Sequence, residues 1–258
     1  MSWDTASAAH ADLPAGDDLD FYRALHRAFD TTLHGGRGST AGVERLMAQA
    51  VDTFDGNVRL RCGDEPPLAC RKACATCCQL RVVATMPEVL LAAHFLARVA
   101  PPLADRGIDL VGALRAAEAK THRRSEAERA ADPVRCPFLA QGVCVIYPVR
   151  PLACRGHAST DARACAEAAA GRRAEVPASA SHRAVRALVQ GALQSSLRDA
   201  GLAWGVYEFN EALVTALNHP GPAAAWWAGD DPLAGARCDE LAPGEQEAVF
   251  DRLRPGAG

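Results

Sequence analysis

Apolar side chains recur at intervals of three and four positions along much of the chain, which is the periodicity of one face of an α-helix. Between residues 17 and 34 the recurring positions are Tyr22, Leu25, Phe29 and Leu33, and two glycines directly after the run favour a helix end there. The same periodicity predicts further helices over residues 41–54, 85–99, 109–130 and 207–218, and over a segment that starts at Ser181.

Polar and special residues mark where several of these helices begin or end. Thr85-Met86-Pro87-Glu88 has the pattern of a capping box, in which a threonine and a glutamate three positions later satisfy free amide groups of the first turn. Pro101-Pro102 predicts the end of that helix, and Gly201-Leu202 fits the glycine-based ending of the helix that starts at Ser181. No series of segments alternates between apolar and polar residues as strands do. The predicted fold class is therefore mostly α.

Two stretches, residues 62–78 and 132–165, interrupt the helical pattern with prolines, glycines and nine of the ten cysteines. We therefore expect helices surrounding an irregular, metal-stapled, cysteine-rich core. The expected organisation is an N-terminal tail with two helices in residues 1–60 and a cysteine-cluster metal-binding region in residues 61–170. In residues 171–258 we expect C-terminal helices that pack on the same domain.

Composition and charge narrow the function classes. The 258 residues are 49% hydrophobic and carry a formal net charge of -3, which argues against non-specific nucleic-acid binding because that needs a basic face. Residues 1–20 lack the basic and apolar regions of a secretory signal, and the longest apolar stretch, residues 89–100, is too short to span a bilayer. We therefore expect a cytoplasmic protein with no nucleic-acid or membrane partner, while a protein partner is left open. In that compartment clustered cysteines more often bind metal or perform redox chemistry than form disulfides.

Eight cysteines form two blocks with the spacing of metal ligands. The first block reads Cys-Arg-Lys-Ala-Cys-Ala-Thr-Cys-Cys, and the second combines Cys-Pro-Phe-Leu, a cysteine after a Gln-Gly turn, and Arg-Pro-Leu-Ala-Cys-Arg. A gap of two or three residues lets a turn direct two sulfurs to one ion or cluster. The candidate metal ligands are Cys70, Cys74, Cys77, Cys78, Cys136, Cys144, Cys154 and Cys165.

The adjacent cysteines Cys77 and Cys78 bear on the kind of metal. The side chains of consecutive residues diverge in an extended backbone, so a multi-iron cluster or two neighbouring ions suit this pair better than one tetrahedral ion. Cations interleaved with the cysteines would lower thiol pKa values; they are Arg71, Lys72, Arg81, Arg135, Arg150, Arg155 and Arg163. An iron–sulfur cluster, with [4Fe–4S] favoured, is the expected cofactor and zinc is the alternative. The eight thiols fit two four-cysteine sites or one cluster with additional redox thiols.

Other interpretations compete with this one. The first three cysteines have the spacing of the radical-SAM motif, but the residues that follow predict helices rather than the alternating strands and helices of that barrel. We expect Cys62 and Cys238 to be inert, because both lie outside the two blocks. His157 could complete a site through a ring nitrogen, and Glu88 could be a carboxylate facing the cluster beside its capping role. We expect Tyr147, Arg150 and Arg155 to bond sulfur or backbone near the cluster.

These motifs resemble the YkgJ-type cysteine-cluster family, described as a zinc- or iron-chelating domain. The resemblance covers residues 70–165 and rests on CRKACATCC, CPFL and GVCVIYPVRPLACRGHASTDARAC. It implies that the first seven candidate cysteines are metal thiolates. Cys165 matches a branch whose second block extends to a further cysteine, with Ser159 and Asp161 in that branch's serine and aspartate positions. The family includes flagellin lysine N-methylases, which this chain resembles in the cysteine blocks only.

We therefore expect a metal-binding protein that holds an iron–sulfur cluster or zinc through thiolates. Redox or protein-modification chemistry, including protein methylation, is one candidate role. The alternatives are a structural zinc-binding module that presents a partner surface, and a metal-handling or sensing protein without catalysis. The sequence leaves open whether the protein is an enzyme and identifies no catalytic residue.

Overall fold

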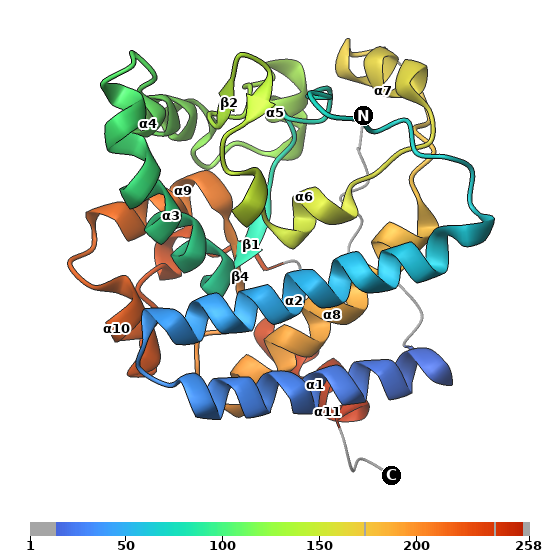
Figure 1. Cartoon of the computed structure of the whole chain (residues 1–258), viewed down its shortest axis with the longest axis vertical. Coiled ribbons are helices and arrows are strands. Elements are labelled where there is room, and N and C mark those ends of the chain that lie inside the picture. Colours follow the sequence, from blue (N-terminus) through green and yellow to red (C-terminus); the bar gives the residue numbers. More distant parts are fainter. Residues whose placement is uncertain (1–13, 173, 240, 255–258) are drawn as a thin grey trace.

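Three long helices form the base of the molecule (Figure 1). They are α1 (Asp17–Gly36), α2 (Thr40–Arg61) and α8 (Ala180–Asp199), which pack on one another, and α11 (Pro243–Leu253) lies against α1 and α8. Serine side chains start two of them: Ser39 accepts the amide of Gly42 in α2, and Ser179 accepts the amide of His182 in α8. The computed structural model describes residues 14–172, 174–239 and 241–254.

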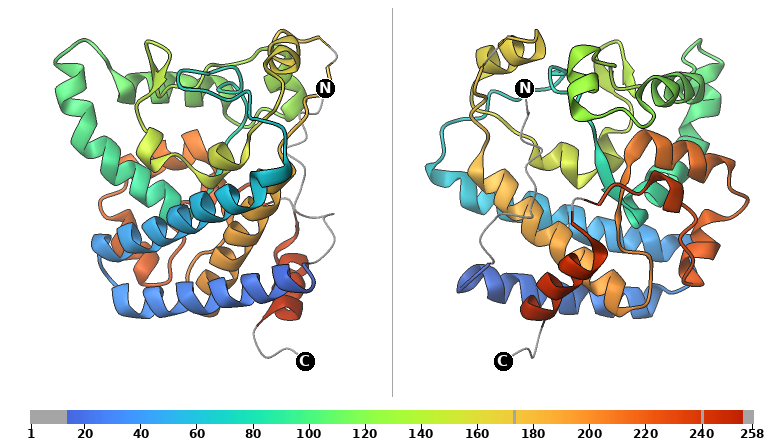
Figure 2. Two further views of the ribbon diagram at one scale, coloured as in Figure 1. Left: turned by 45° about the vertical axis from the view of Figure 1, so that its right-hand side comes forward. Right: turned by 180° about the vertical axis from the view of Figure 1, so that it is seen from behind.

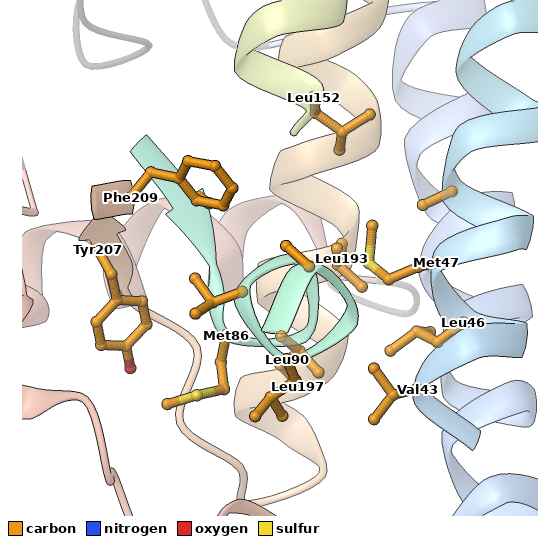
Figure 3. Packing of buried hydrophobic residues seen from close by; sticks show 14 of the residues in the cluster. Val43, Leu46, Met47, Met86, Leu90, Leu152, Leu193, Leu197, Tyr207 and Phe209 are labelled. Atoms are coloured by element: carbon orange, nitrogen blue, oxygen red, sulfur yellow. The ribbon is translucent and has the colours of Figure 1, made fainter. Parts of the chain in front are cut away.

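The apolar core lies between this base and the helices above it. Apolar stripes of α2, α8 and the next helix, α3 (Met86–Ala104), meet there and bury their side chains from water (Figure 3). Each fully buried aliphatic or aromatic side chain stabilises the fold by roughly 1.5–3 kcal/mol. The residues of this contact that Figure 3 labels include Val43, Leu46, Met47, Leu90, Leu193 and Leu197.

A short antiparallel strand pair stands beside the core. β1 (Val83–Thr85) pairs with β4 (Val206–Glu208) in the register Val83↔Glu208, and each strand leads directly into a helix, β1 into α3 and β4 into α9 (Phe209–Asn218). α4 (Leu110–Thr121) packs on α3 and α9, and α10 (Pro222–Trp227) buries both of its tryptophans.

The cysteine-rich segments lie on the side of the molecule opposite the base (Figures 1 and 2). They contain α5 (Glu126–Ala131), the hairpin of β2 (Leu139–Ala140) and β3 (Val143–Cys144), η3 (Tyr147–Val149), α6 (Leu152–Gly156) and α7 (Ala162–Ala169), while η2 (Cys62–Asp64) directly follows α2 in the base. The remaining short element, η4 (Ala234–Ala236), contacts α9 and β4.

The predicted mostly α class is confirmed, with three differences in detail. The helix predicted over residues 41–54 continues to Arg61. Pro101-Pro102 lies within the last turn of α3 rather than after it. The helix predicted over residues 109–130 is two helices, α4 and α5, separated by a turn in which Arg123 has a φ of 52°. Within the described ranges, no helix is both long and apolar enough to cross a membrane.

The cysteines do not form the centre of the fold as predicted. All ten are half-buried or exposed, whereas the fully buried core consists of aliphatic and aromatic side chains, most of them on helices. The physical reason is that the long apolar stripes of α2, α3 and α8 cover one another, so helix side chains supply most of the core, to which the cysteine-rich segments add Phe138, Ile146 and Leu152.

Candidate metal centre

The first cysteine block folds as a series of turns between α2 and β1. The amides of Cys74, Cys78 and Leu80 each donate to the carbonyl oxygen three residues earlier, over 2.9–3.1 Å. Ala73, in the first of these turns, takes the left-handed conformation, with a φ of 64°. Turns of this kind keep successive cysteines close together without a helix or strand.

The second block reaches the first through the main chain. The amide of Cys136 donates to the carbonyl of Cys78 over 2.7 Å. The chain then makes the β2–β3 hairpin in the register Leu139↔Cys144, with φ of 50° and 79° at Gln141-Gly142. Two consecutive positive φ values are the signature of the tight hairpin turn that returns a strand alongside itself. The hairpin therefore brings Cys144 back toward Cys136.

Cys154 is placed by α6, and the buried carboxylate of Glu88 fixes the start of α6. One oxygen of Glu88 accepts the amide and the hydroxyl of the predicted capping box, Thr85 N and Thr85 Oγ1, at 2.7 Å each. The other oxygen accepts the amide of Leu152, the first residue of α6, at 2.6 Å. Glu88 is only 2% exposed. It therefore connects the start of α3 to the loop that carries Cys154.

Arg155 holds the same loop from its other side. Its guanidinium donates to the carbonyls of Arg150 (3.2 Å) and Pro148 (2.9 Å) and pairs with Asp55 of α2 at 3.3 Å. Burial lowers the pKa of Arg155, while Asp55 opposes that effect. An arginine bound to two carbonyls of one loop closes the loop into a fixed shape.

Five thiols act on one another electrostatically where these segments converge, and we call them the thiol cluster: Cys77, Cys78, Cys136, Cys144 and Cys154. The charge of Cys78 acts on each of the other four, and the charges of Cys136 and Cys144 act on Cys154. Electrostatic effects between thiols indicate that the sulfurs lie near one another, because water and salt screen charges that lie farther apart. The cluster thus joins residues separated by up to 77 positions in the chain (154 - 77).

The thiols of the cluster differ in acidity. A hydrogen bond from Cys77, together with the positive charges of Arg135 and Arg150, lowers the pKa of Cys78 to about 7, although burial opposes this. Burial raises the pKa of Cys136 to about 12 and also raises the pKa of Cys144 and Cys154. Negative charge on the neighbouring sulfurs adds to these increases. A bound cation would reverse this effect, since metal coordination favours the thiolate.

Two backbone amides act on sulfurs of the cluster. The Phe138 amide works to lower the pKa of Cys136 and the Ile146 amide that of Cys144, in each case against the larger effect of burial. Each donor lies two residues after the cysteine that it serves. Hydrogen bonds to sulfur stabilise thiolates and tune the potential of bound iron–sulfur clusters.

Arg150 provides a test of whether the cluster suits an anionic metal–thiolate centre. Its Nε is buried and has no hydrogen-bond partner among the described residues, and its side chain lies over the ring of Tyr147, 4.0 Å from the ring centroid. Its charge acts on Cys78, Cys144 and Cys154. A buried donor without a partner is costly, and a centre with four thiolates carries net negative charge. The donor set and this buried Nε without a partner therefore fit a thiolate-bound metal.

Three predicted ligands lie outside the thiol cluster. Cys70 borders it, because its charge acts on Cys77, and its exposed sulfur accepts the amide of Ser159 at 3.5 Å. Cys74 is exposed, with its sulfur 3.9 Å from Thr76 Oγ1. Cys165 is half-buried on α7.

The thiols of the described residues converge without forming a closed coordination sphere. No group of three or more cysteine, histidine, aspartate or glutamate side chains in residues 14–172, 174–239 and 241–254 is arranged to hold one metal ion. His157 is half-buried at the end of α6, where burial and the charge of Arg186 lower its pKa.

The sequence pattern missed the main role of two residues. Glu88 was predicted as a capping residue, and its bond to the amide of Leu152 could not be read from a local pattern because the two lie 64 positions apart. Asp55, the partner of Arg155, carries no local signal either, since it is one of several acidic residues on α2.

Comparison with known proteins gives one match. Residues 69–175 match the model of the CxxCxxCC family, described as a "putative zinc- or iron-chelating domain". In this chain three residues, rather than two, separate the first two cysteines of that signature. The matched range contains all eight candidate ligands and the whole thiol cluster. No curated protein and no solved structure matches the chain.

Proposed function

Because residues 69–175 make this chain a member of the CxxCxxCC cysteine-cluster family, we propose that its thiol cluster binds an iron–sulfur cluster, with Cys78, Cys136, Cys144 and Cys154 as the ligands. The observation that carries the proposal is that thiols from three separate segments act on one another electrostatically and that the charge of Arg150 acts on Cys78, Cys144 and Cys154. Each of these four cysteines interacts with at least two of the others.

Cys77 is the remaining member of the thiol cluster, and we assign it a separate role. It donates a hydrogen bond to Cys78, and its own pKa is raised by that bond and by burial. A protonated Cys77 beside a ligated Cys78 would act as a hydrogen-bond donor to the ligand sulfur. Cys70 borders Cys77 and, with Cys74 and Cys165, is available for a second site or for redox chemistry.

Iron–sulfur is favoured over zinc by the chemistry around the sulfurs. Two amide donors and the charges of Arg150 and Arg135 surround them, and such groups stabilise a reduced, more negative cluster. When bound, the cluster would supply one-electron redox chemistry at the surface opposite the three-helix base. The chain's own residues would hold it: Glu88 and Arg155 fix the loop of Cys154, and Arg150 compensates the thiolate charge.

Metal and sulfide analysis of the anaerobically purified protein tests this proposal. We expect about four iron and four sulfide per chain and a broad visible absorption band if the four cysteines bind one [4Fe–4S] cluster. Cys136→Ser and Cys154→Ser should each lose iron, whereas Cys238→Ser should keep it, because Cys238 lies on the other side of β4, where its amide donates to Val206.

Other outcomes of the same analysis contradict the proposal in distinct ways. A colourless protein with stoichiometric zinc would replace iron–sulfur with a closed zinc site that staples the three segments. A protein that has neither metal after purification and reconstitution would refute metal binding by the thiol cluster. Iron retained in Cys154→Ser would refute the ligand assignment alone.

A further inference from the structure

The two cysteine segments are rich in positive charge, although the whole chain has a net charge of -3. No aspartate or glutamate occurs in residues 66–87 or in residues 133–160, the stretches that carry seven of the eight candidate ligands. The same stretches contain six cations: Arg71, Lys72, Arg81, Arg135, Arg150 and Arg155. The acidic residues of the chain therefore lie elsewhere, and the charge is distributed unevenly over the molecule.

Three of these cations are exposed and unpaired. Arg71, Lys72 and Arg135 form no ion pair or side-chain hydrogen bond with the residues that the structure describes. Carboxylates on the flanking helices α5 and α7 and on the turn after α5 are already paired with other arginines: Glu126 with Arg81, Asp132 with Arg124, and Glu167 with Arg163. The three free cations thus remain available for negative charge from outside the chain.

Exposed apolar side chains lie in the same stretches. Among the described residues four large apolar side chains are exposed, and three of them belong here: Leu68, Val143 and Tyr147. Tyr147 is 56% exposed, and its ring lies against the guanidinium of Arg150, 4.0 Å from ring centroid to guanidinium carbon. Tyrosine and arginine are enriched at the centres of protein interfaces, where an apolar core is surrounded by a polar rim.

The cations and the apolar side chains share one side of the molecule. The amide of Cys136 donates to the carbonyl of Cys78 over 2.7 Å, which joins the two segments. The charges of Arg135 and Arg150 both act on Cys78, so these two side chains lie near the same thiol. Both segments lie opposite the three-helix base (Figures 1 and 2).

From this arrangement we propose that the cysteine side of the molecule is a docking surface for an acidic protein. We call it the docking face and define it by these residues: Arg71, Lys72, Arg135, Val143, Tyr147 and Arg150. Carboxylates of the partner would pair with the three free cations, and an apolar side chain of the partner would cover Tyr147 and Val143. The partner would then lie beside the thiol cluster.

An acidic protein fits the docking face better than a nucleic acid or an anionic membrane. Binding to phosphates draws on many closely spaced positive charges, whereas this face has three free cations. An extended polyanion would also be repelled by the acidic remainder of the chain. A folded partner can place a few carboxylates against the face and keep its other surfaces away from the acidic side.

Zero-length crosslinking of the purified full chain, with its metal content as isolated, tests this proposal. A carbodiimide joins a lysine amine to a carboxylate only where the two are in contact, and the chain has only two lysines, Lys72 and Lys120. Both are exposed. Lys120 lies on α4 in an acidic setting, where the hydrogen bond and charge of Arg124 and the charge of Lys120 together lower the pKa of Asp132. Lys120 is therefore the internal control.

The probes are two acetylated peptides that lack lysine and have equal glutamate content. One contains leucine and phenylalanine, and the other has serine in their place. We expect the apolar peptide to crosslink to Lys72 in clear excess over Lys120, and in higher yield than the serine peptide does. Raising the salt from about 50 to about 500 mM should remove most of the product, because salt screens exposed charges.

Two double variants show whether the face is responsible. Arg71→Glu with Arg135→Glu keeps Lys72 as the reporter and should lower the crosslink yield about tenfold, because attraction of the peptide becomes repulsion. Arg27→Glu with Arg37→Glu is the matched control. Both of its arginines are exposed, lie on or directly after α1 in the base, and change the net charge equally when reversed.

Each contrary outcome overturns the proposal. Equal crosslinking at Lys72 and Lys120 of the wild type does so even if a variant does not fold. Equal yields from the two peptides, or equal losses in the two double variants, do so as well. Tighter binding of a DNA duplex or of phosphatidylserine vesicles, measured by competition for the Lys72 product, would assign the face to phosphates instead. The metal analysis described above is separate, because the face consists of the chain's own side chains.

Discussion

The buried carboxylate of Glu88 is the most testable link between the helical core and the candidate metal centre. Replacing it by glutamine keeps the volume and shape of the side chain but converts one acceptor oxygen to an NH2 donor. In the wild type the two oxygens accept three hydrogen bonds, from Thr85 N, Thr85 Oγ1 and Leu152 N. The single oxygen of glutamine can accept either the bonds from Thr85 or the bond from Leu152, but not both sets.

The expected loss of folding stability follows from those three hydrogen bonds. If the amide oxygen of the substituted glutamine faced Leu152, its NH2 group would face the amide of Thr85, and one buried backbone donor would lose its partner. That loss costs about 1–3 kcal/mol, and the bonds that remain weaken because they are no longer charge-assisted. We therefore expect Glu88→Gln to lower the free energy of unfolding by about 2–4 kcal/mol.

The chain contains a matched control for this substitution. Glu128 forms the same capping box with Ser125, accepting its amide and hydroxyl at 2.7 Å each, but it is exposed and holds no second segment. Glu128→Gln should therefore change stability far less than Glu88→Gln, because water can replace the lost bonds.

Urea-induced unfolding of the wild type and both variants, followed by circular dichroism, measures the difference. Metal content of the same samples reports on the loop of Cys154, which Glu88 anchors through Leu152. We expect Glu88→Gln to lose metal more readily to a chelator than Glu128→Gln does. If the two variants unfold at the same urea concentration, Glu88 does not anchor α6 as argued.

Three further predictions concern other charged groups. Arg150→Gln should weaken metal binding about tenfold or more in chelator competition, because the charge opposite the thiolates is lost. Glu65→Gln should be less stable than the wild type at pH 7, and the difference should shrink as the pH falls from about 4.5 toward about 2. The reason is that hydrogen bonds hold the folded pKa of Glu65 at about 2, so their contribution to stability is fully present above the unfolded pKa and is lost as the pH falls to the folded value. Melting curves across this pH range measure the difference. Arg129→Met should cost about 3–5 kcal/mol in chemical unfolding, since it leaves the buried carboxylate of Glu208, 3.2 Å away, without its partner.

The local patterns of the sequence predict most of the helices but not all of their limits. α1 and α9 begin within two residues of their predicted starts, and the capping box of α3 is present. The glycine-based ending of α8 is also present, with Leu202 N donating to Leu197 O and Gly201 at a φ of 71°. Helical periodicity and caps are local properties, so a single segment determines them.

The helix ends that the sequence pattern predicts wrongly depend on contacts between segments. α2 continues past Phe54 to Arg61, where Cys62 and Ser181 meet its end. The turn after α4 depends on Arg129, which reaches back to the carbonyl of Thr121 and across to Glu208. Neither contact can be predicted from the periodicity of one helix, because the partner lies elsewhere in the chain.

In the candidate site, too, local features are predicted from the sequence and contacts between segments are not. Ligand spacing identifies which cysteines to consider, since a short gap limits how far apart two sulfurs can lie. It does not rank them: in the first block Cys77 and Cys78 join the thiol cluster, while Cys74 is exposed four positions earlier. The difference arises from the Cys136 amide, which binds the carbonyl of Cys78 and thereby selects the end of the block that faces the second one.

The arrangement of anchors also indicates how metal would act on the fold. Most of the apolar core belongs to helices such as α2, α3 and α8, and the cysteine segments add Phe138, Ile146 and Leu152 to it, so the helices should remain folded when metal is removed. The loop of Cys154 is different, because polar contacts of Glu88 and Arg155 tie it to α3 and α2 beside the buried side chain of Leu152, and a metal bound to Cys154 would add a further attachment. Chelation should therefore increase amide hydrogen exchange in residues 70–80 and 136–156 and leave the centre of α8 protected. Exchange that rises equally in both regions would mean that the helices depend on the metal, as the cysteine-rich core predicted from sequence would have required.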